Sequence, residues 1–590
     1  MTPTLHYSIF IDEPHSHFLK VTLSIPVNGA SEVCVGMPVW TPGSYMVREY
    51  SQFLQDLSAT GAGGSALGLE QLDKRRWKIS TAGQETVEFH YTLYANQLTV
   101  RTNHVDDTHG FICGAATFMM VDGMKEEPAT VSLSLPDGWD VVTPLLQDAN
   151  GHYQAENFDM LVDSPIETGH LQRTDFEACG KPHAYIFWGE GNYDIDAIVK
   201  DTIDVIEETA RHYGGELPYE EYLFIVHAAK GIRGGLEHMN STVLAWDSLS
   251  FQPLSEHEEF MRLVAHEFYH TWNVKRIRPR VLGPFDYSQE VHSKMLWFHE
   301  GGTVYYEGLI PVRSGILRRE SWLKEMGKSV HTLRSFPGRK HLSVGASSFN
   351  AWTKLYRRNE HSQNSMISYY LKGELVCFCL DKLIRENTGG EKSLDDVMRL
   401  FYERTAPPKP GFLDEEVAPW IAEIAGCSVD DFLAAYVDGL EPLPLEETFA
   451  WYGLELKGDH DSPSPDHGPG AALGIKTSAT MGRAKVTFVN EEGPAFAAGL
   501  NAFDEIIALD GYQVSHSTLG TRLKLREPGE EVTLTFFRRE RIRELKVTLG
   551  ERPFDSYKVT GREDATDEEK ARFVALLGVP FPSPDEKKGD

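Results

Sequence analysis

Residues 263–273 read LVAHEFYHTWN and contain the pattern HExxH, whose fixed positions are His266, Glu267 and His270. Residues four apart lie on one face of a helix, so His266 and His270 can offer two imidazoles to one ion. Apolar residues recur around the motif at spacings of three and four: Phe260, Leu263, Val264 and Phe268. This periodicity predicts a buried helix that holds both imidazoles at a zinc ion.

A catalytic zinc site takes three protein ligands and leaves one position open, so a third ligand is required. Glu267 is not that ligand, because in such motifs the glutamate takes a proton from the attacking water. The downstream candidates are Glu290, Glu300 and the neighbouring His292 and His299. Glu300 lies in LWFHEGGTVYYEG, residues 296–308, where an aromatic residue precedes the carboxylate and two glycines follow it, which lets another helix approach closely. We expect one Zn²⁺ per chain, held by His266, His270 and one of these candidates.

HExxH followed by Trp-x-x-Glu-Gly resembles the gluzincin metallopeptidases, the superfamily that includes aminopeptidase N. The resemblance implies that the glutamate of the second motif, Glu300, is the third zinc ligand. The spacing departs from that of aminopeptidase N, and Glu290 fits it better. Its surroundings, YSQEVHSK, lack both the Trp and the Gly, so Glu300 remains the preferred ligand.

Two further segments resemble the same superfamily. GGLEHMNS, residues 234–241, is similar to the Gly-x-Met-Glu-Asn strand of aminopeptidases, and the resemblance implies that Glu237 binds the free α-ammonium of the substrate. The alternative for Glu237 is a surface strand residue. YYLKGEL, residues 369–375, resembles Tyr-x-Lys-Gly, which makes the hydroxyl of Tyr370 a candidate donor to the oxyanion, an effect of about 3 kcal/mol in comparable sites. Tyr369 is the rival for this role.

GGLEH, HEFYHTWNVKRIRP and MPVWTPGSYMVREY, followed by a PDZ-like segment, together look like the PDZ-containing glycyl aminopeptidase family. The resemblance implies a zinc aminopeptidase that releases small amino-terminal residues, Gly and Ala above all. It also implies a multidomain α+β fold with a β-rich amino-terminal domain, a thermolysin-like, mainly helical catalytic domain and a PDZ-like β domain.

Residue periodicity divides the chain into four parts. Alternation with a period of two, as in Leu19, Val21, Leu23 and Ile25, predicts a β-sandwich-like domain over 1–175. Helical patterns at 196–213, 366–386 and 393–404, with strand-like text near 221–246, indicate a catalytic domain over 176–449. The polar segment 458–470 predicts an exposed loop or linker inside the third part, 450–552, which is PDZ-like. The fourth part, 553–590, is a charged tail with one short helix near 566–577.

Two short segments, one in the third part of the chain and one in the second, each allow two interpretations. Residues 472–475, ALGI, are a candidate carboxylate-binding loop for a peptide carboxy terminus, and the alternative is a β module without a peptide ligand. The basic cluster Lys275, Arg276, Arg278 and Arg280 either complements the dipole of the zinc helix or grips the far carboxylate of a peptide.

Composition limits the partners of the chain. The 590 residues carry a formal net charge of −30, which disfavours nucleic acid and anionic lipid. We find no apolar run long enough to span a membrane and no basic, apolar amino terminus, and so expect a cytoplasmic protein without membrane partners. The expected partners are peptides with a free amino terminus.

The same residues are compatible with two other functions. A zinc endopeptidase would use Glu237 only to line a longer cleft. A PDZ-based peptide-binding protein or chaperone would leave the metal site idle, although a structural metal site has no use for Glu267.

Overall fold

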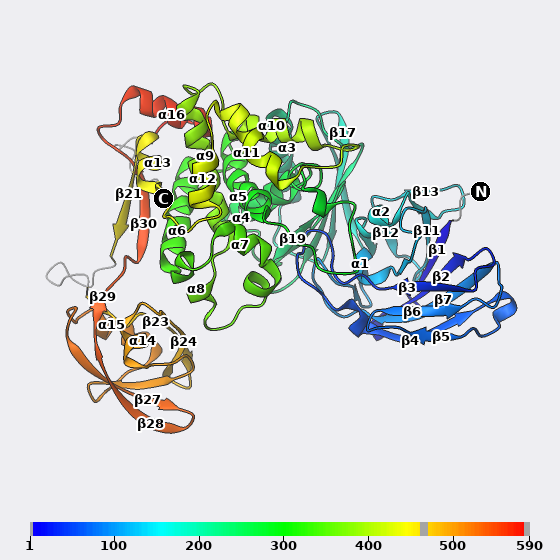
Figure 1. The fold of residues 1–590 in the computed structure, drawn as a ribbon, viewed down its shortest axis with the longest axis horizontal. Helices are drawn as coiled ribbons and strands as arrows, with labels where there is room; N and C mark the ends of the chain where they lie inside the picture. The colour runs from blue at the N-terminus through cyan, green and yellow to red at the C-terminus, as the bar shows by residue number, and fades with distance from the viewer. Residues whose placement is uncertain (1–3, 461–469, 583–590) are drawn as a thin grey trace. The chain divides into compact units, whose positions relative to one another are not determined.

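The computed structural model describes residues 4–460 and 470–582, which form two compact units. The first unit comprises the chain up to residue 293 together with 306–316 and 397–417, and the second comprises the other described residues. In Figure 1 the blue and cyan part of the chain is built mostly of strands and the green and yellow part mostly of helices.

Three sheets form the amino-terminal part of the first unit. The largest has the order β13 (Leu146–Gln147), β14 (Tyr153–Ala155), β11 (Ala129–Ser134), β1 (Leu5–Phe10), β2 (Phe18–Pro26), β7 (Thr86–Tyr94) and β4 (Leu54–Thr60). The second has the order β10 (Met120–Val121), β3 (Glu32–Gly36), β6 (Arg76–Ser80) and β5 (Leu69–Gln71). The third has the order β12 (Asp140–Val142), β15 (Ile166–Gly169), β9 (His109–Ile112) and β8 (His104–Val105).

The alternation predicted for these strands is confirmed. Leu19, Val21, Leu23 and Ile25 of β2 all point into the core, with at most 1% of each side chain exposed. Each such side chain stabilises the fold by about 1.5–3 kcal/mol through removal of apolar surface from water. The period of two therefore marks strands with one face against the core.

A mixed five-stranded sheet forms the rest of the first unit's β structure. Its order is β16 (Gln172–Ala178), β17 (Lys181–Trp188), β18 (Tyr222–Ala228), β20 (Ser241–Trp246) and β19 (Gly234–Glu237). The central strands β17, β18 and β20 are parallel, and β19 runs antiparallel to β20 at the edge. Every residue of β18 is buried, as expected of a strand covered on both faces. Helices α3 (Ile195–His212) and α4 (Leu254–Tyr269) belong to the same unit.

Most of the remaining helices lie in the second unit: α6 (Arg319–Ser335), α7 (Val344–Phe349), α9 (Tyr369–Asn387), α12 (Asp430–Tyr436) and α13 (Leu445–Trp451). Helices α5 (Leu296–Arg313), α10 (Leu394–Thr405) and α11 (Asp414–Ala425) contribute residues to both units. The three predicted helices are confirmed as α3, α9 and α10. Helix α9 begins later than expected because the side chain of Ser368 accepts a hydrogen bond from the amide of Leu371 and caps it. No helix in the described part of the chain has the length and apolar character needed to cross a membrane.

A further β module follows within the second unit. Its sheet has the order β23 (Ile475–Thr480), β24 (Arg483–Val489), β25 (Glu505–Leu509), β27 (Glu531–Arg538) and β28 (Arg541–Thr548), and β26 (Tyr512–Gln513) pairs with β25. Two short helices accompany it, α14 (Pro494–Ala498) and α15 (His516–Leu523). The predicted alternations through Val486 and Leu534 are confirmed, since both side chains lie in one apolar core.

In the carboxy-terminal segment 553–590 the short helix predicted near 566–577 is confirmed as α16 (Asp567–Leu577). The segment also contains a strand that the sequence did not predict, β30 (Ser556–Gly561), which pairs antiparallel with β21 (Leu454–Asp459). Helix α16 is held by three fully buried side chains, Phe573, Leu576 and Leu577, and this apolar face outweighs the surrounding charge. Strand β21 also takes the first two residues of the predicted linker 458–470, of which residues 461–469 lie outside the described residues.

Candidate metal centre and active site

Helix α4 presents the HExxH motif at its carboxyl end, where His270 is the C-cap residue. Phe260, Val264 and Phe268 are completely buried, and Leu263 is half-buried. The apolar face predicted from the sequence therefore anchors the helix. His266 and Glu267 sit on its last turn, so their backbone positions are fixed by packing rather than by a loop.

The two imidazoles of the motif face each other. Nε2 of His266 lies 3.0 Å from Nε2 of His270. Nδ1 of His270 lies 2.6 Å from the backbone oxygen of Asn273, and Nδ1 of His266 lies 2.7 Å from Oε2 of Glu307. Both of these oxygens only accept, so each Nδ1 carries the proton and each Nε2 presents a lone pair. Two facing lone pairs repel unless a cation lies between them, so the pair fits a metal ion.

Glu307 is a site residue that sequence reasoning missed. Burial alone would raise its pKa, but hydrogen bonds from His266 and Arg262 hold the pKa below its ordinary value, so it stays a carboxylate. A carboxylate behind a histidine ligand fixes the tautomer and orientation of the ring. Glu307 lies seven residues after Glu300, two turns further along α5, and this spacing was the available signal.

His266, His270 and Glu300 form a candidate metal site. One ligand atom from each residue lies within 4.8 Å of the other two, and all three residues are buried. Two imidazoles and one carboxylate are a donor set suited to zinc. Two of the alternative ligands, Glu290 and His292, lie on the surface. Oε1 of Glu290 lies 3.7 Å from Nε2 of His292. His299 is completely buried but is not part of the group.

Glu237 and Glu267 meet beside the same histidine. Strand β19 ends at Glu237, and one carboxylate oxygen from each glutamate lies within 4.8 Å of a ring nitrogen of His270. The contact depends on Gly235, because a Cβ there would lie 2.0 Å from Oε1 of Glu267. Gly235 of the GGLEH segment therefore lets the helix carrying Glu267 approach the strand carrying Glu237. The alternative of a surface residue does not hold for Glu237, which is only 3% exposed.

The carboxylate of Glu237 faces a cavity of about 410 Å³. Its walls include Trp40, Gly43, Met239, Lys275 and Arg278. Gly43 has φ of +81°, and a Cβ there would lie 2.6 Å from Oε2 of Glu237, so no larger residue fits. Oε1 of Glu237 has no hydrogen-bond partner among the described residues. A buried acceptor of this kind calls for an external donor.

The residues of the basic cluster after α4 differ in the groups that they contact. Lys275 is buried, and its Nζ lies 2.6 Å from Oδ1 of Asp163. Arg276 is buried and donates to the backbone oxygens of Met239, Thr271 and Pro218. Arg278 lines the cavity beside Glu237, and its guanidinium lies over the ring of Phe285. Of the two interpretations of this cluster, gripping a distant carboxylate suits Arg278 best.

Tyr369 and Tyr370 open helix α9 in the second unit, and their rings stack with centroids 4.8 Å apart. Tyr369 is completely buried, whereas Tyr370 is partly exposed. Gly301 of α5 and Gly373 of α9 meet closely, since a Cβ on Gly301 would lie 2.4 Å from Cα of Gly373. The prediction that the glycines after Glu300 admit another helix is confirmed.

Comparison with known proteins gives three matches along the chain. Residues 6–170 match the Peptidase M61 N-terminal domain, residues 259–376 match the M61 glycyl aminopeptidase, and residues 471–549 match a PDZ domain. The search of curated proteins returns no match.

Among solved structures, an aminopeptidase N family protein from Idiomarina loihiensis is similar over 97% of this chain and 100% of its own, with 29% identity and a TM-score of 0.90. An M1 zinc metallopeptidase from Deinococcus radiodurans covers 75% of this chain and 95% of its own, with 11% identity and a TM-score of 0.46. The M61 matches include the HExxH helix, and a PDZ domain follows them. The chain belongs to the M61 glycyl aminopeptidase family of metallopeptidases.

Proposed function

We propose that this chain is a zinc-dependent aminopeptidase that removes small amino-terminal residues, Gly and Ala first, from peptides. The metallopeptidase family and the His266, His270 and Glu300 group support one Zn²⁺ per chain. The preference for Gly rests on the family description as a glycyl aminopeptidase.

The observation that carries the proposal is the buried carboxylate of Glu237. It lies beside Glu267 and His270, and its Oε1 has no hydrogen-bond partner among the described residues. A buried carboxylate attracts a cationic donor strongly because little water screens it. The free α-ammonium of a peptide is such a donor. Holding it next to Glu267 sets the cleavage point one residue from the amino end.

Each proposed residue has a separate task in the reaction. His266, His270 and Glu300 would hold the zinc ion, which would supply Lewis acidity to a water molecule and to the substrate carbonyl group. Glu267 takes the proton from the attacking water on a carboxylate oxygen and passes it to the leaving amine. Tyr370 donates its hydroxyl hydrogen to the oxyanion, and partial exposure makes it better suited than the buried Tyr369. Glu307 and Asn273 hold the two imidazoles in place.

The PDZ domain supplies a second peptide contact. Gly474, in the predicted carboxylate-binding loop, has φ of +72°, a conformation that favours glycine, and β23 begins directly after it. PDZ domains bind a peptide as an added strand and capture its carboxy terminus on loop amides. We propose residues 472–475 as this loop.

Glu237→Gln tests the assignment of the ammonium site. Loss of one charge-assisted hydrogen bond costs about 1.5–3 kcal/mol, so kcat/KM for glycyl and alanyl anilides should fall roughly tenfold to a hundredfold. Glu259→Gln is the matched control, since Glu259 lies on the outer part of α4 and pairs with Arg233. Equal losses on free and amino-blocked substrates would reject the role of Glu237, and cleavage of blocked peptides would instead favour an endopeptidase.

Glu267→Gln tests the chemical step separately. General-base catalysis contributes about 10²–10⁴-fold, so turnover should fall by that factor while the chain keeps its zinc. Full activity in this variant would reject the mechanism. An unmodified chain that binds zinc and peptides but cleaves neither anilide would point to a PDZ-based binding protein.

A further inference from the structure

A second cluster of buried histidines lies within the first unit, away from the HExxH residues in the sequence. His109 opens β9 and Glu167 lies on β15, two paired strands of one sheet, whereas His227 lies on β18 of the five-stranded sheet. All three side chains are completely buried. One ligand atom from each lies within 4.8 Å of the other two. The cluster therefore brings two sheets together through polar groups.

The polar atoms of this cluster are poorly satisfied. Among the described residues, neither ring nitrogen of His109 has a hydrogen-bond partner, and neither do Oε1 of Glu167 and Nδ1 of His227. The one hydrogen bond inside the group joins Nε2 of His227 to Oε2 of Glu167 at 2.8 Å. An unsatisfied buried polar atom destabilises the fold, so several in one place call for a missing ligand.

The geometry at His109 matches a metal ligand. Nε2 of His109 lies 3.7 Å from Oε1 of Glu167, too far for a hydrogen bond. Two ligands at about 2.0–2.1 Å from one tetrahedral ion lie roughly 3.4 Å apart, close to the observed separation. An ion between these atoms would satisfy both at once.

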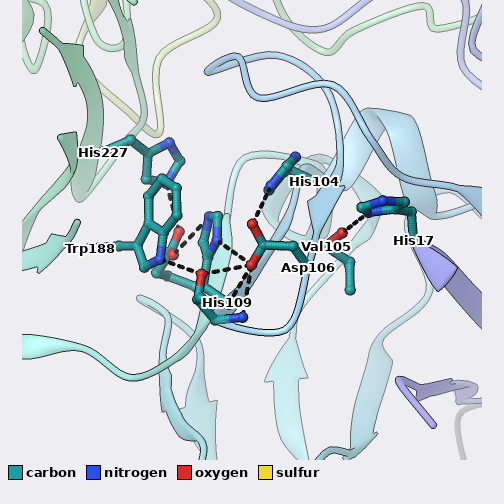
Figure 2. Close-up of polar contacts among 9 residues, drawn as sticks. His17, His104, Val105, Asp106, His109, Trp188 and His227 are labelled. Carbon is teal, nitrogen blue, oxygen red and sulfur yellow. Dashed lines mark hydrogen bonds and ion pairs between the residues drawn. The ribbon is translucent and has the colours of Figure 1, made fainter. Parts of the chain in front are cut away.

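The surroundings of His109 hold the ring in one orientation. Its ring stacks on that of Trp188 with centroids 3.6 Å apart, and Nδ1 lies 3.8 Å from Oδ1 of Asp106. Figure 2 shows Asp106 between His104 and His109, with His227 and Trp188 on the other side of His109. Burial would raise the pKa of Asp106, but the nearby ring of His109 and hydrogen bonds from Thr108 and His104 hold the pKa well below its ordinary value. A carboxylate behind the second ring nitrogen is the usual support of a histidine ligand.

We propose that His109, Glu167 and His227 bind a second divalent transition-metal ion, zinc first, which joins the amino-terminal β9–β15 sheet to the five-stranded sheet. Two imidazoles and one carboxylate are the same donor set as in the candidate catalytic site, and such donors favour Zn²⁺ over Mg²⁺ or Ca²⁺. Because the ligands come from two sheets, binding free energy at this site is also folding free energy. The role is structural, since complete burial leaves no room for a peptide.

Metal counting tests this site in the full-length, tag-free chain. The protein is stripped with a chelator, reloaded with Zn²⁺, freed of loose metal by gel filtration and analysed for zinc per chain. We expect two zinc ions in the unmodified protein and one in each of His109→Gln and His270→Gln. His90→Gln is the matched control, because His90 lies on β7 of another sheet, where its ring nitrogens lie 3.0 Å from the hydroxyls of Thr22 and Thr60, and the substitution should leave both ions.

The outcomes separate this site from the catalytic one. A single zinc that His270→Gln removes and His109→Gln keeps would overturn the second site and leave the proposed function intact. A single zinc with the opposite dependence would support the second site and count against the proposed function. Two ions that both survive His109→Gln would also overturn the proposal.

A second measurement covers the case in which His109→Gln does not fold. Glu167→Gln keeps the size of the side chain and a hydrogen-bond acceptor for His227, so it is the milder variant. The folded His270→Gln chain gives an independent reading: one retained zinc, with a melting temperature that rises on adding Zn²⁺, supports the site. No retained zinc and no shift in melting temperature would overturn it.

Discussion

Nδ1 of His266 lies 2.7 Å from Oε2 of Glu307, and this contact fixes which ring nitrogen faces the candidate metal site. The two residues come from different helices, α4 and α5. The contact thus ties the orientation of one ligand to the packing of the helix that also carries Glu300.

Glu307→Gln should weaken metal binding without removing a ligand. Loss of a carboxylate behind a histidine ligand typically costs 10–100-fold in metal affinity, because the ring loses its fixed tautomer. Competition with a chromophoric chelator measures the affinity. Glu320→Gln, at an exposed position at the start of α6, is the control and should change nothing. Unchanged affinity in Glu307→Gln would show that the contact does not support the site.

Gly43→Ala should damage substrate binding through Glu237. A Cβ at residue 43 would lie 2.6 Å from Oε2 of Glu237, and φ is +81°, so the substitution displaces the carboxylate and strains the backbone. Gly29→Ala is a matched control, since Gly29 also has a positive φ of +78° but nothing lies within 4 Å of its Cβ position. We expect KM for a glycyl anilide to rise at least tenfold in Gly43→Ala alone. A similar change in both variants would mean that strain, and not the collision, is responsible.

Tyr370→Phe and Tyr369→Phe form a matched pair for the oxyanion donor. Removing one such donor costs about 10²–10³-fold in kcat. We expect this loss in Tyr370→Phe with KM little changed, and a much smaller loss in Tyr369→Phe. Steady-state kinetics on an alanyl anilide distinguish them, and the reverse order would move the role to Tyr369.

Asp163→Asn should lower stability in a pH-dependent way. Burial raises the pKa of Asp163, but Lys275 and His238 lower it, and the net pKa is about 2. The folded value is below the ordinary 3.8, so the carboxylate adds stability above about pH 4 and loses it as pH falls toward 2. The corresponding contribution at neutral pH is about 2 kcal/mol. Urea midpoints of the variant and the unmodified chain should differ at pH 7 and converge as the pH falls to about 2.

Asp137 is exposed, so Asp137→Asn serves as the control for these stability measurements. It should follow the unmodified chain at every pH. A gap between Asp163→Asn and the unmodified chain that stays constant from pH 7 to pH 2 would contradict an ionic role for Asp163.

Short motifs in the sequence predicted most residues of the candidate catalytic site. His266, Glu267 and His270 share one turn of helix, and the glycines around Glu237 and Glu300 mark close approaches that the structure contains at Gly235 and Gly301. Each of these motifs spans only a few residues, so the arrangement of residues within one motif follows from its secondary structure.

Residues brought together by tertiary packing could not be found in this way. Glu307 reaches His266 only because α5 packs beside α4. His109, Glu167 and His227 come from three strands in two sheets, and no short pattern links them. Likewise, β30 lies about a hundred residues beyond its partner β21, so the composition of the last segment suggested a tail.

The pairing of β21 with β30 has a consequence for the architecture of the carboxy-terminal half. Asp459 and Ser556 are partners in this ladder, so the chain departs for the PDZ domain and returns from it at neighbouring points. A domain whose first and last residues lie side by side can be exchanged for another domain without breaking the fold around it. Replacing the intervening segment with a short turn should preserve the ladder and leave a compact peptidase, onto which other recognition domains can be grafted.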